Sequence, residues 1–404
     1  MLKGKNIVLG VTGGIAVYKA ADLVSKLVKQ HANVEVIMTE AATKFVSPLT
    51  FQTMSVNKVH TEMFGLVSHF DVEHISLAQK ADVILIAPAT ANTIGKIACG
   101  IADNLLTTVV MASHAKIIYA PAMNTNMYNN PIFQENMNKL KQLGHEFIKT
   151  GVGRLACGDY GAGKMAEPSE IVDYLISSFV RKDFLGKKVV ITAGPTIEPI
   201  DPVRYITNHS SGKMGYSLAK EALDRGAEVI LITGPTSLTP PEGAEVVKVN
   251  TTQEMFDAVG VYFDDCDILI KSAAPLDYKP DKVSPIKIKK NDEEGDNLDL
   301  KFVRNPDIAA HYGKLKKDQI IVGFAAETNN VEEFATGKLK KKNFDFIVAN
   351  DVTEPGAGFK NDTNIATIID NHGNLDKHPL MGKKHLAKII FDKIYDIMDT
   401  RGAR

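Results

Sequence analysis

Two short glycine-containing turns each follow a run of apolar residues, an arrangement that places phosphates in α/β proteins. The first run is Lys5 to Val11, and it leads into Gly13 and Gly14. The second is Lys187 to Thr192, and it leads into Ala193-Gly194-Pro195-Thr196. Apolar, β-branched runs of this length predict buried parallel strands, and glycine lets backbone N–H groups approach a phosphate at the start of the following helix. We therefore expect two phosphate-type sites in this chain.

The first turn does not predict a dinucleotide, because it lacks the G-x-G-x-x-G spacing of NAD-binding turns. The loops at neighbouring strand ends carry small and polar residues, notably after the apolar run ADVILIA. Ala89, Thr90 and Asn92 lie in one such loop, and Thr39 lies in another. These residues could hold a cofactor phosphate or a ribityl chain. Taken alone, the glycine pair has a structural alternative as a tight turn.

A more specific pattern is the polar loop Pro121 to Tyr128, which contains P-A-M-N around Asn124. Asparagine tolerates turns, so the loop alone could be structural. Combined with H-I-S-L at His74, with A-D-N-L at Ala102 to Leu105 and with Cys157, it resembles the phosphopantothenoylcysteine decarboxylase family of FMN proteins. The resemblance implies a catalytic set of His74, Asn124 and Cys157. The residues expected to bind FMN are Gly13, Gly14, Thr39, Ala89, Thr90 and Asn92.

The second half contains an equally specific set of motifs, beginning with Thr192 to Gly215. Gly212-Lys213 is not part of a Walker A loop, because Thr207 stands where the first glycine is needed. With further motifs between Ala273 and Thr328, this half resembles phosphopantothenate-cysteine ligase of the CTP-dependent bacterial type. The two resemblances cover essentially the whole chain, in the order found in fused bifunctional coenzyme A biosynthesis proteins.

The ligase resemblance implies that Asn208 and Lys287 are catalytic and that Mg2+ accompanies the nucleotide, with metal ligands unknown. The residues expected around CTP are Ala273, Ala274, Asp277, Lys287, Asn305, Pro306, Asp307, Ile308, Phe324, Lys338 and Lys342. Two of these assignments have structural alternatives. The run KLKKK at Lys338 to Lys342 could be a solvated helix face, and Asn208 could be a turn residue.

The expected chemistry explains why these residue types are needed. CMP transfer from CTP activates the carboxylate of phosphopantothenate as an acyl-CMP anhydride, which the amine of cysteine then displaces. The resulting carboxylate has no adjacent electron sink, so the CH2-SH group must be oxidised to a thioaldehyde before CO2 can leave. We expect Asn124 to bind the departing carboxylate, His74 to assist proton movement, and Cys157 to protonate the enethiol carbon.

The fold expected from the hydrophobic pattern is α/β, with two doubly wound, mostly parallel sheets. We expect a flavodoxin-like decarboxylase domain over residues 1–183 and a Rossmann-like ligase domain over 187–404. In the first half the predicted strands are Ile7–Val11, Val34–Met38, Val83–Ala87, Ile117–Ala120 and His145–Ile148. In the second half they are Val189–Thr192, Val229–Ile232, Val246–Val249, Ile268–Ser272, Ile320–Phe324 and Phe346–Ala349.

Three other segments have distinct patterns. Ala20 to Val28 has apolar residues at helical spacing, which predicts an amphipathic helix. Gly151 to Pro168 has too many glycines for a helix or a strand, and we expect either an active-site cover or disorder there. The charged stretch Leu276 to Val303 predicts a flap, and a helix is expected at Ser169 to Phe179.

Composition excludes several classes of protein. The 404 residues exceed one typical core, and a net charge of -1 gives no reason to expect nucleic-acid or membrane partners. The three cysteines show no disulfide or zinc spacing, and we expect Cys99 and Cys266 to be buried and structural. The start of the chain has no targeting pattern, which favours a cytoplasmic protein. Its partners should be small-molecule substrates.

The resemblance also implies a homo-oligomer, since related decarboxylase domains form trimers with FMN at subunit interfaces and fused proteins form dodecamers. Two other functions use the same flavin fold. Flavin prenyltransferases resemble the first half but lack the P-A-M-N asparagine, and in eukaryotes the fold also serves as a regulatory phosphatase inhibitor. CTP-dependent turnover would separate these alternatives.

Overall fold

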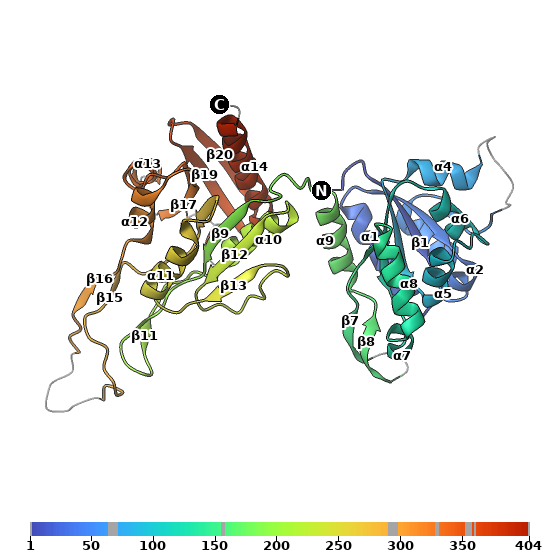
Figure 1. The fold of residues 1–404 in the computed structure, drawn as a ribbon, viewed down its shortest axis with the longest axis horizontal. Coiled ribbons are helices and arrows are strands. Elements are labelled where there is room, and N and C mark those ends of the chain that lie inside the picture. Colours follow the sequence, from blue (N-terminus) through green and yellow to red (C-terminus); the bar gives the residue numbers. More distant parts are fainter. Residues whose placement is uncertain are drawn as a thin grey trace. The chain divides into compact units, whose positions relative to one another are not determined.

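The structure is a computed structural model, and it describes residues 2–63, 72–154, 158–289, 298–327, 331–351, 358 and 361–402. Cys157 and Lys290 lie outside the described residues. The chain forms two compact units, Met1–Phe179 and Val180–Arg404 (Figure 1). Each unit is an α/β domain built on a mostly parallel sheet, so the expected fold class is confirmed.

Unit 1 contains a six-stranded parallel sheet in the order β3-β2-β1-β4-β5-β6. Its strands are β1 (Asn6–Val11), β2 (Asn33–Met38), β3 (Val59–His60), β4 (Val83–Ala89), β5 (Lys116–Pro121) and β6 (Glu146–Phe147). The strand order reverses between β1 and β4, which is where ligands bind in doubly wound sheets. β3 was not predicted, because two residues are too few to show a period.

Helices cover both faces of this sheet and bury a separate apolar cluster on each. One face carries α1 (Val17–Lys29), α3 (Pro48–Ser55) and α9 (Pro168–Ser178). The other carries α4 (Glu73–Lys80), α5 (Ala91–Ala98), α6 (Leu105–Ala112) and α8 (Pro131–Gln142). Two short helices, α2 (Glu40–Thr43) and α7 (Thr125–Tyr128), follow β2 and β5.

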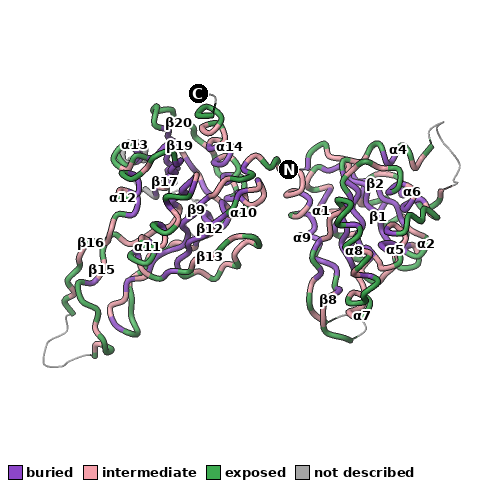
Figure 2. Tube along the Cα trace, viewed as in Figure 1, coloured by how far each residue is buried: buried purple, intermediate pink, exposed green. Residues whose placement is uncertain are grey.

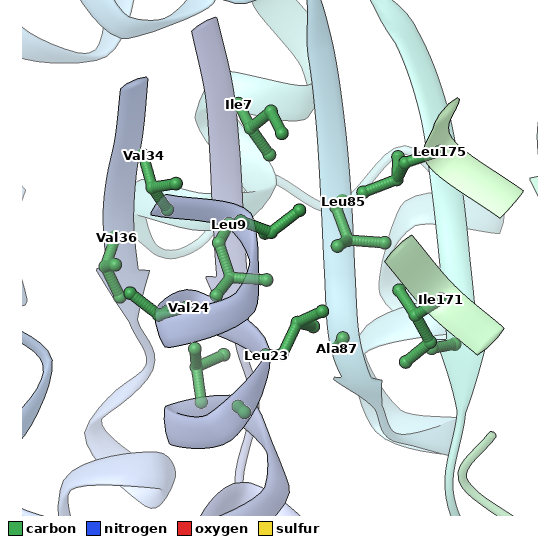
Figure 3. Close-up of a cluster of buried hydrophobic side chains, with 14 of the residues drawn as sticks. Ile7, Leu9, Leu23, Val24, Val34, Val36, Leu85, Ala87, Ile171 and Leu175 are labelled. Atoms are coloured by element: carbon green, nitrogen blue, oxygen red, sulfur yellow. The ribbon is translucent and has the colours of Figure 1, made fainter. Parts of the chain in front are cut away.

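The core under α1 confirms the predicted amphipathic helix. Figure 3 shows Leu23 and Val24 of α1 among side chains of β1, β2 and β4, including Leu9. Leu9 and Leu23 are fully buried. Removing a side chain of this size from water contributes roughly 1.5–3 kcal/mol, which fixes α1 and the turn before it on the sheet.

The glycine-rich stretch is a β-hairpin, so the expectation that it forms neither helix nor strand is wrong. Its strands are β7 (Gly151–Arg154) and β8 (Tyr160–Lys164), which pair in antiparallel fashion. A Cβ atom on Gly161 would lie 2.7 Å from the Thr125 hydroxyl, and one on Gly163 would collide with the Met123 carbonyl oxygen. The glycines therefore let the hairpin pack closely against the loop that follows β5.

Unit 2 contains an eight-stranded sheet in the order β13-β12-β9-β14-β17-β18-β19-β20. The first six strands are parallel neighbours, and β19 and β20 add an antiparallel edge. The strands are β9 (Lys188–Ala193), β12 (Glu228–Thr233), β13 (Glu245–Lys248), β14 (Ile268–Lys271), β17 (Ile320–Glu327), β18 (Phe346–Asp351), β19 (Thr363–Asp370) and β20 (Leu375–Gly382). The edge hairpin was not predicted, because β20 is mostly exposed and contains Pro379.

Two groups of helices cover this sheet. α10 (Lys213–Asp224) and α14 (Lys383–Gly402) contribute to one apolar cluster, and α11 (Thr252–Phe263), α12 (Ile308–Leu315) and α13 (Val331–Lys341) contribute to the other. Two small ribbons complete the unit, β10 (Glu198–Pro199) with β11 (Tyr205–Ile206), and β15 (Tyr278–Pro280) with β16 (Phe302–Arg304).

The predicted flap has β15 and β16 at its root, and these strands extend away from the large sheet of unit 2 (Figure 1). Figure 2 shows that the strands at the centre of each unit are buried, whereas much of the chain in this extension is exposed. Hydrogen bonds of its own ribbon and bonds to the β10–β11 ribbon, such as the one from Ser284 N to the Ile200 carbonyl oxygen at 3.0 Å, position this segment.

Candidate functional site

Unit 1 has a cavity of about 1080 Å³ at the carboxyl ends of its central strands. Its lining includes six of the residues selected from the sequence, namely Gly13, Gly14, Thr39, Thr90, Asn92 and Asn124. Ala89 does not line the cavity. It is fully buried in β4, and its carbonyl oxygen accepts a hydrogen bond from Ala122 N at 3.0 Å. Ala89 therefore holds the cavity wall instead of facing a ligand.

The first turn is locked beside the loop after β4. The Thr12 hydroxyl donates to the Pro88 carbonyl oxygen at 2.7 Å, and Thr90 N donates to the Thr12 hydroxyl at 3.1 Å. A Cβ atom on Gly13 would collide with the side chain of Ala41. The turn can adopt this position only because residue 13 has no side chain.

The cavity favours anions. α1 and α5 both begin at its wall, and neither has a side-chain cap, so their first N–H groups and dipoles face this region. Four basic side chains line the cavity against two acidic ones, a formal charge of +2 for the lining, which Glu167 outside the lining partly offsets by pairing with Lys19 and Lys164. The basic residues are Lys19, Lys96, Arg154 and Lys164, and the acidic ones are Glu40 and Asp103. Sequence reasoning missed these cations, because they come from four separate segments.

Asn124 is held by its neighbours on both sides of its amide. Its Oδ1 accepts from Asn126 N at 2.8 Å, and its Nδ2 donates to Asp159 Oδ2 at 2.8 Å. The first bond caps α7 and the second comes from the β7–β8 hairpin. Asp159 was not selected from the sequence, because its pairing depends on the hairpin that was not predicted.

His74 lies apart from the other predicted residues of unit 1. It is the second residue of α4, is half-buried, and does not occur among the described residues that line the cavity. Figure 1 shows α4 at an edge of unit 1 away from β7 and β8. Among the described residues of a single copy, Asn124 thus lines the cavity and His74 does not.

In unit 2 the predicted residues at the ends of β9 and β14 are joined by hydrogen bonds. Asn208 Nδ2 donates to the Ala274 carbonyl oxygen, and Asn208 Oδ1 accepts from Ser210 N at 2.9 Å. Ala274 N in turn donates to the carbonyl oxygen of Gly194 at 3.0 Å. The glycine turn, the Asn208 loop and the Ala273-Ala274 segment therefore meet at one place.

Asn305 extends this group. Its Nδ2 donates to the Leu276 carbonyl oxygen at 2.9 Å and to Glu198 Oε1 at 3.0 Å, while its backbone N donates to the Asp277 carbonyl oxygen at 2.9 Å. Asn305 Oδ1 is buried and has no hydrogen-bond partner within the described part of the chain. A buried acceptor of this kind is costly unless a ligand or water satisfies it. Glu198, which is 2% exposed, was not selected from the sequence.

A second charged group lies where α12 begins. Asp307 caps α12 by accepting from Ala310 N at 3.0 Å, and it pairs with Lys342 Nζ at 3.2 Å. Burial raises the pKa of Asp307, but the Ala310 N–H and Lys342 outweigh this and hold it below its usual value. Lys271 is buried beside them, and burial together with Lys342 lowers its pKa to about 7. Lys271 was not selected from the sequence, because nothing but its position at a strand end distinguishes it.

The remaining predicted ligase residues are more dispersed. Lys287 is exposed and precedes Ile288, whose backbone N donates to Asp201 Oδ2 at 3.2 Å. Lys338 is exposed on α13, as the solvated-face alternative predicts. Phe324 is half-buried in β17, Pro306 is half-buried, and Ile308 is buried at the start of α12.

The described residues contain no cluster suited to a metal ion, and their two cysteines differ in burial. No group of three or more His, Cys, Asp or Glu side chains suited to a metal ion occurs among the residues that the structure describes. Cys266 is buried as expected, and burial raises the pKa of its thiol to about 12. Cys99 is exposed, so the expectation that it is buried is wrong, because it follows the last turn of α5. In the described part of the chain no helix could cross a membrane.

Comparisons with known proteins agree on both halves. Residues 1–180 match the family model "Flavoprotein", and residues 184–398 match "DNA/pantothenate metabolism flavoprotein C-terminal domain". The chain is 49% identical over 408 residues to the coenzyme A biosynthesis bifunctional protein CoaBC of Bacillus subtilis, with all of both chains covered. It is 43% identical over 406 residues to the protein of that name from Escherichia coli K12, again with full coverage. A crystal structure of the C-terminal domain of such a protein covers 54% of this chain and 99% of its own, at 41% identity and a TM-score of 0.47.

Proposed function

Because this chain belongs to the family of coenzyme A biosynthesis bifunctional proteins, we propose that it performs two consecutive reactions. It ligates 4'-phosphopantothenate to cysteine with CTP through an acyl-CMP intermediate, and it decarboxylates the product to 4'-phosphopantetheine with FMN. Residues 1–183 carry the decarboxylase and residues 187–404 the ligase. The observation that carries this proposal is the similarity to bifunctional relatives over the full length of the chain.

The cavity of unit 1 fits FMN. Gly13 and Gly14 leave room for a close approach, the uncapped starts of α1 and α5 and the net positive lining suit a phosphate, and the volume exceeds that of most single-ligand pockets. Gly13, Gly14, Thr39, Thr90 and Asn92 would hold the cofactor. When bound, FMN supplies a two-electron oxidant and then the reductant that returns those electrons to the substrate.

Around that cofactor the residues of the chain have separate tasks. Asn124 lies at the cavity wall, where its hydrogen bond to Asp159 orients its amide, and its role is to bind the substrate carboxylate. Cys157 protonates the substrate carbon after CO2 has left, and His74 assists proton movement. Because His74 lies outside the cavity of its own copy, we propose that the active form is a homo-oligomer in which a neighbouring copy completes the site.

In unit 2, Lys287 offsets charge on the CTP phosphates, and Asn208 holds the acyl oxygen or orients the attacking amine. The buried Asn305 Oδ1 and the Asp307–Lys342 pair support a polar ligand at this end of the sheet. Mg2+ would accompany the nucleotide and offset the charge of its phosphates, a role that requires few protein ligands. CTP and free cysteine are intracellular metabolites, so we propose a cytoplasmic location.

The decisive experiment is a two-step assay with the full chain. With 4'-phosphopantothenate, cysteine, CTP and Mg2+, we expect pyrophosphate release followed by CO2 release and 4'-phosphopantetheine. ATP in place of CTP is the matched control and should support much slower pyrophosphate release. Protein that contains FMN but forms no product with CTP would instead support one of the non-ligase functions of the flavin fold.

A further inference from the structure

One face of unit 1, away from the cavity lining, contains a buried histidine between two carboxylates. His60 is 9% exposed at the end of β3. Its Nδ1 lies 2.6 Å from Glu73 Oε1, and its Nε2 lies 3.5 Å from Glu35 Oε2. An ionised carboxylate can only accept hydrogen bonds, so Nδ1 carries the proton of the short contact to Glu73, and a second proton on Nε2 would face the Glu35 carboxylate. The arrangement therefore fits the imidazolium form of His60.

Two lysines complete the cluster and attach both ends of α4 to the sheet edge. Lys58 Nζ lies 2.9 Å from Glu73 Oε1 at the start of the helix. Lys80, its last residue, forms an ion pair with Glu35 of β2. We call His60, Glu35, Glu73, Lys58 and Lys80 the α4 ion network.

The charges of the network agree with this geometry. Burial alone would lower the pKa of His60, but the hydrogen bonds and charges of Glu35 and Glu73 outweigh it and raise the pKa. The hydrogen bond from His60 is the main cause that lowers the pKa of Glu35. Burial raises the pKa of Glu73, yet Lys58 and His60 outweigh that effect and lower it. A neutral His60 would leave one bare ring nitrogen against a carboxylate oxygen.

α4 buries few side chains of its own. It has eight residues, and its buried ones are Leu77 and Ala78 in the second turn. Its first turn has no side-chain cap from Val72. The contacts that the structure gives for Glu73 thus provide the side-chain anchor of that turn, and the next residue is His74.

We propose that protonated His60 is a positioning residue for His74, which it orients by holding Glu73 and with it the first turn of α4. This inference rests on the proposed function, in which His74 assists proton movement during decarboxylation. Loss of the α4 ion network would let the first turn of α4 shift, while the flavin-binding turns, which are held by Thr12 and Thr90, stay in place. A displacement of about 1 Å at a reacting group can reduce a rate by about a hundredfold, so a partial shift should reduce it by about tenfold.

The test compares full-length wild-type protein with His60→Gln and Glu73→Gln, loaded with FMN. CO2 release from 4'-phospho-N-pantothenoylcysteine is measured between pH 6 and pH 8.5, and hydrogen exchange of the α4 amides is measured at both ends of that range. Asp22→Asn is the matched control, because it breaks the exposed Asp22–Lys26 pair in the same unit. Glu73 is 30% exposed at its side chain, so Glu73→Gln tests the α4 ion network even if His60→Gln fails to fold.

We expect His60→Gln and Glu73→Gln to release CO2 about tenfold more slowly than wild type at pH 6, with faster exchange in the first turn of α4. For His60→Gln the difference should shrink at high pH, where His60 of the wild type also loses its proton, whereas Glu73→Gln also loses the pair with Lys58 and should stay slow. Asp22→Asn should match wild type throughout. A purely structural role of His60 would give a rate ratio for His60→Gln that does not change with pH.

Two outcomes would overturn the inference in distinguishable ways. Wild-type CO2 release by His74→Asn would remove the role of His74 in the proposed function, and the inference with it. Two results would overturn the positioning role alone, provided that His74→Asn is slow. One is a ratio of wild-type to His60→Gln rates that does not change with pH, and the other is unchanged hydrogen exchange of α4 in Glu73→Gln.

Discussion

The two units have the same order of parallel strands, but the polar groups at the ends of their central strands are arranged differently. β3-β2-β1-β4-β5-β6 in unit 1 corresponds to β13-β12-β9-β14-β17-β18 in unit 2, and in both the order reverses beside the first strand. In unit 1 the Thr12 hydroxyl beside the glycine turn donates to the Pro88 carbonyl oxygen, and a cavity of about 1080 Å³ is present at this end of the sheet. In unit 2 the corresponding side chains bond within the protein, since Asn208 donates to the Ala274 carbonyl oxygen and Asn305 donates to Glu198.

This difference agrees with the proposed roles of the two units, a resident cofactor in unit 1 and a transient nucleotide in unit 2. A cavity that exists before binding needs no rearrangement, which suits a group that stays bound. In unit 2 the amide N–H groups of Asn208 and Asn305 already have partners within the protein, so any bond they make to a ligand must replace one of these. Sequence-similar turns on one fold can thus serve different purposes, because the function depends on the site.

The largest expected effect is on the preformed cavity. Gly13→Val should abolish FMN binding, because its side chain would collide with Ala41. CO2 release should be lost with it, whereas CTP-dependent pyrophosphate release should persist. Gly153→Ala is the control, since a Cβ atom there meets nothing within 4 Å. Loss of both activities in Gly13→Val would show that the two sites are not independent.

The next effect concerns charge in the ligase. Lys287→Gln should slow formation of acyl-CMP by about a hundredfold, because charge builds on the phosphates in that step. Pyrophosphate release without cysteine reports this step directly, and FMN content should not change. Asn208→Asp should behave differently, releasing pyrophosphate while acyl-CMP accumulates. Equal behaviour of the two variants would remove the separation of their roles.

Lys271→Met should change stability in a pH-dependent way. The folded state lowers the pKa of this lysine to about 7, so the unfolded chain binds an extra proton there, and folding is penalised most at and below neutral pH. The penalty shrinks as pH rises toward the usual lysine value of about 10.4. We expect the variant to raise the free energy of unfolding of unit 2 by about 1–3 kcal/mol at pH 7 and by less at pH 9. Lys314→Met, at an exposed position on α12, should show no such gain.

A smaller effect is expected from Thr12→Val. The substitution removes the donor to the buried Pro88 carbonyl oxygen, which should lower the free energy of unfolding of unit 1 by about 1–2 kcal/mol. FMN should bind several-fold more weakly, as seen by fluorescence titration. Unaltered FMN affinity would mean that this hydrogen bond does not hold the cavity open.

The parallel strands could be predicted because buried strands are apolar and β-branched over their whole length, as in Val83–Ala89. The β7–β8 hairpin could not, since its glycines serve a close approach that exists only in three dimensions. The cations around the cavity were missed for the same reason. Lys19 and Arg154 are far apart in sequence and meet at one cavity.

The roles of some residues depend on partners from other elements, which their own sequence context does not reveal. His60 has an ordinary sequence context, and its importance comes from Glu35 and Glu73, which lie on other elements. His74 and Asn124 were selected together by resemblance, yet only Asn124 lines the cavity of its own copy among the described residues. Motifs identified the residues, whereas packing determines which of them meet.

The central claim is that one chain carries two independent sites, one preformed for FMN and one for CTP. It is tested most directly by equilibrium binding of both ligands to the full-length protein. The account predicts one FMN and one CTP per chain, with neither ligand displacing the other and with Gly13→Val losing FMN alone. Competition between FMN and CTP for a single site would contradict it.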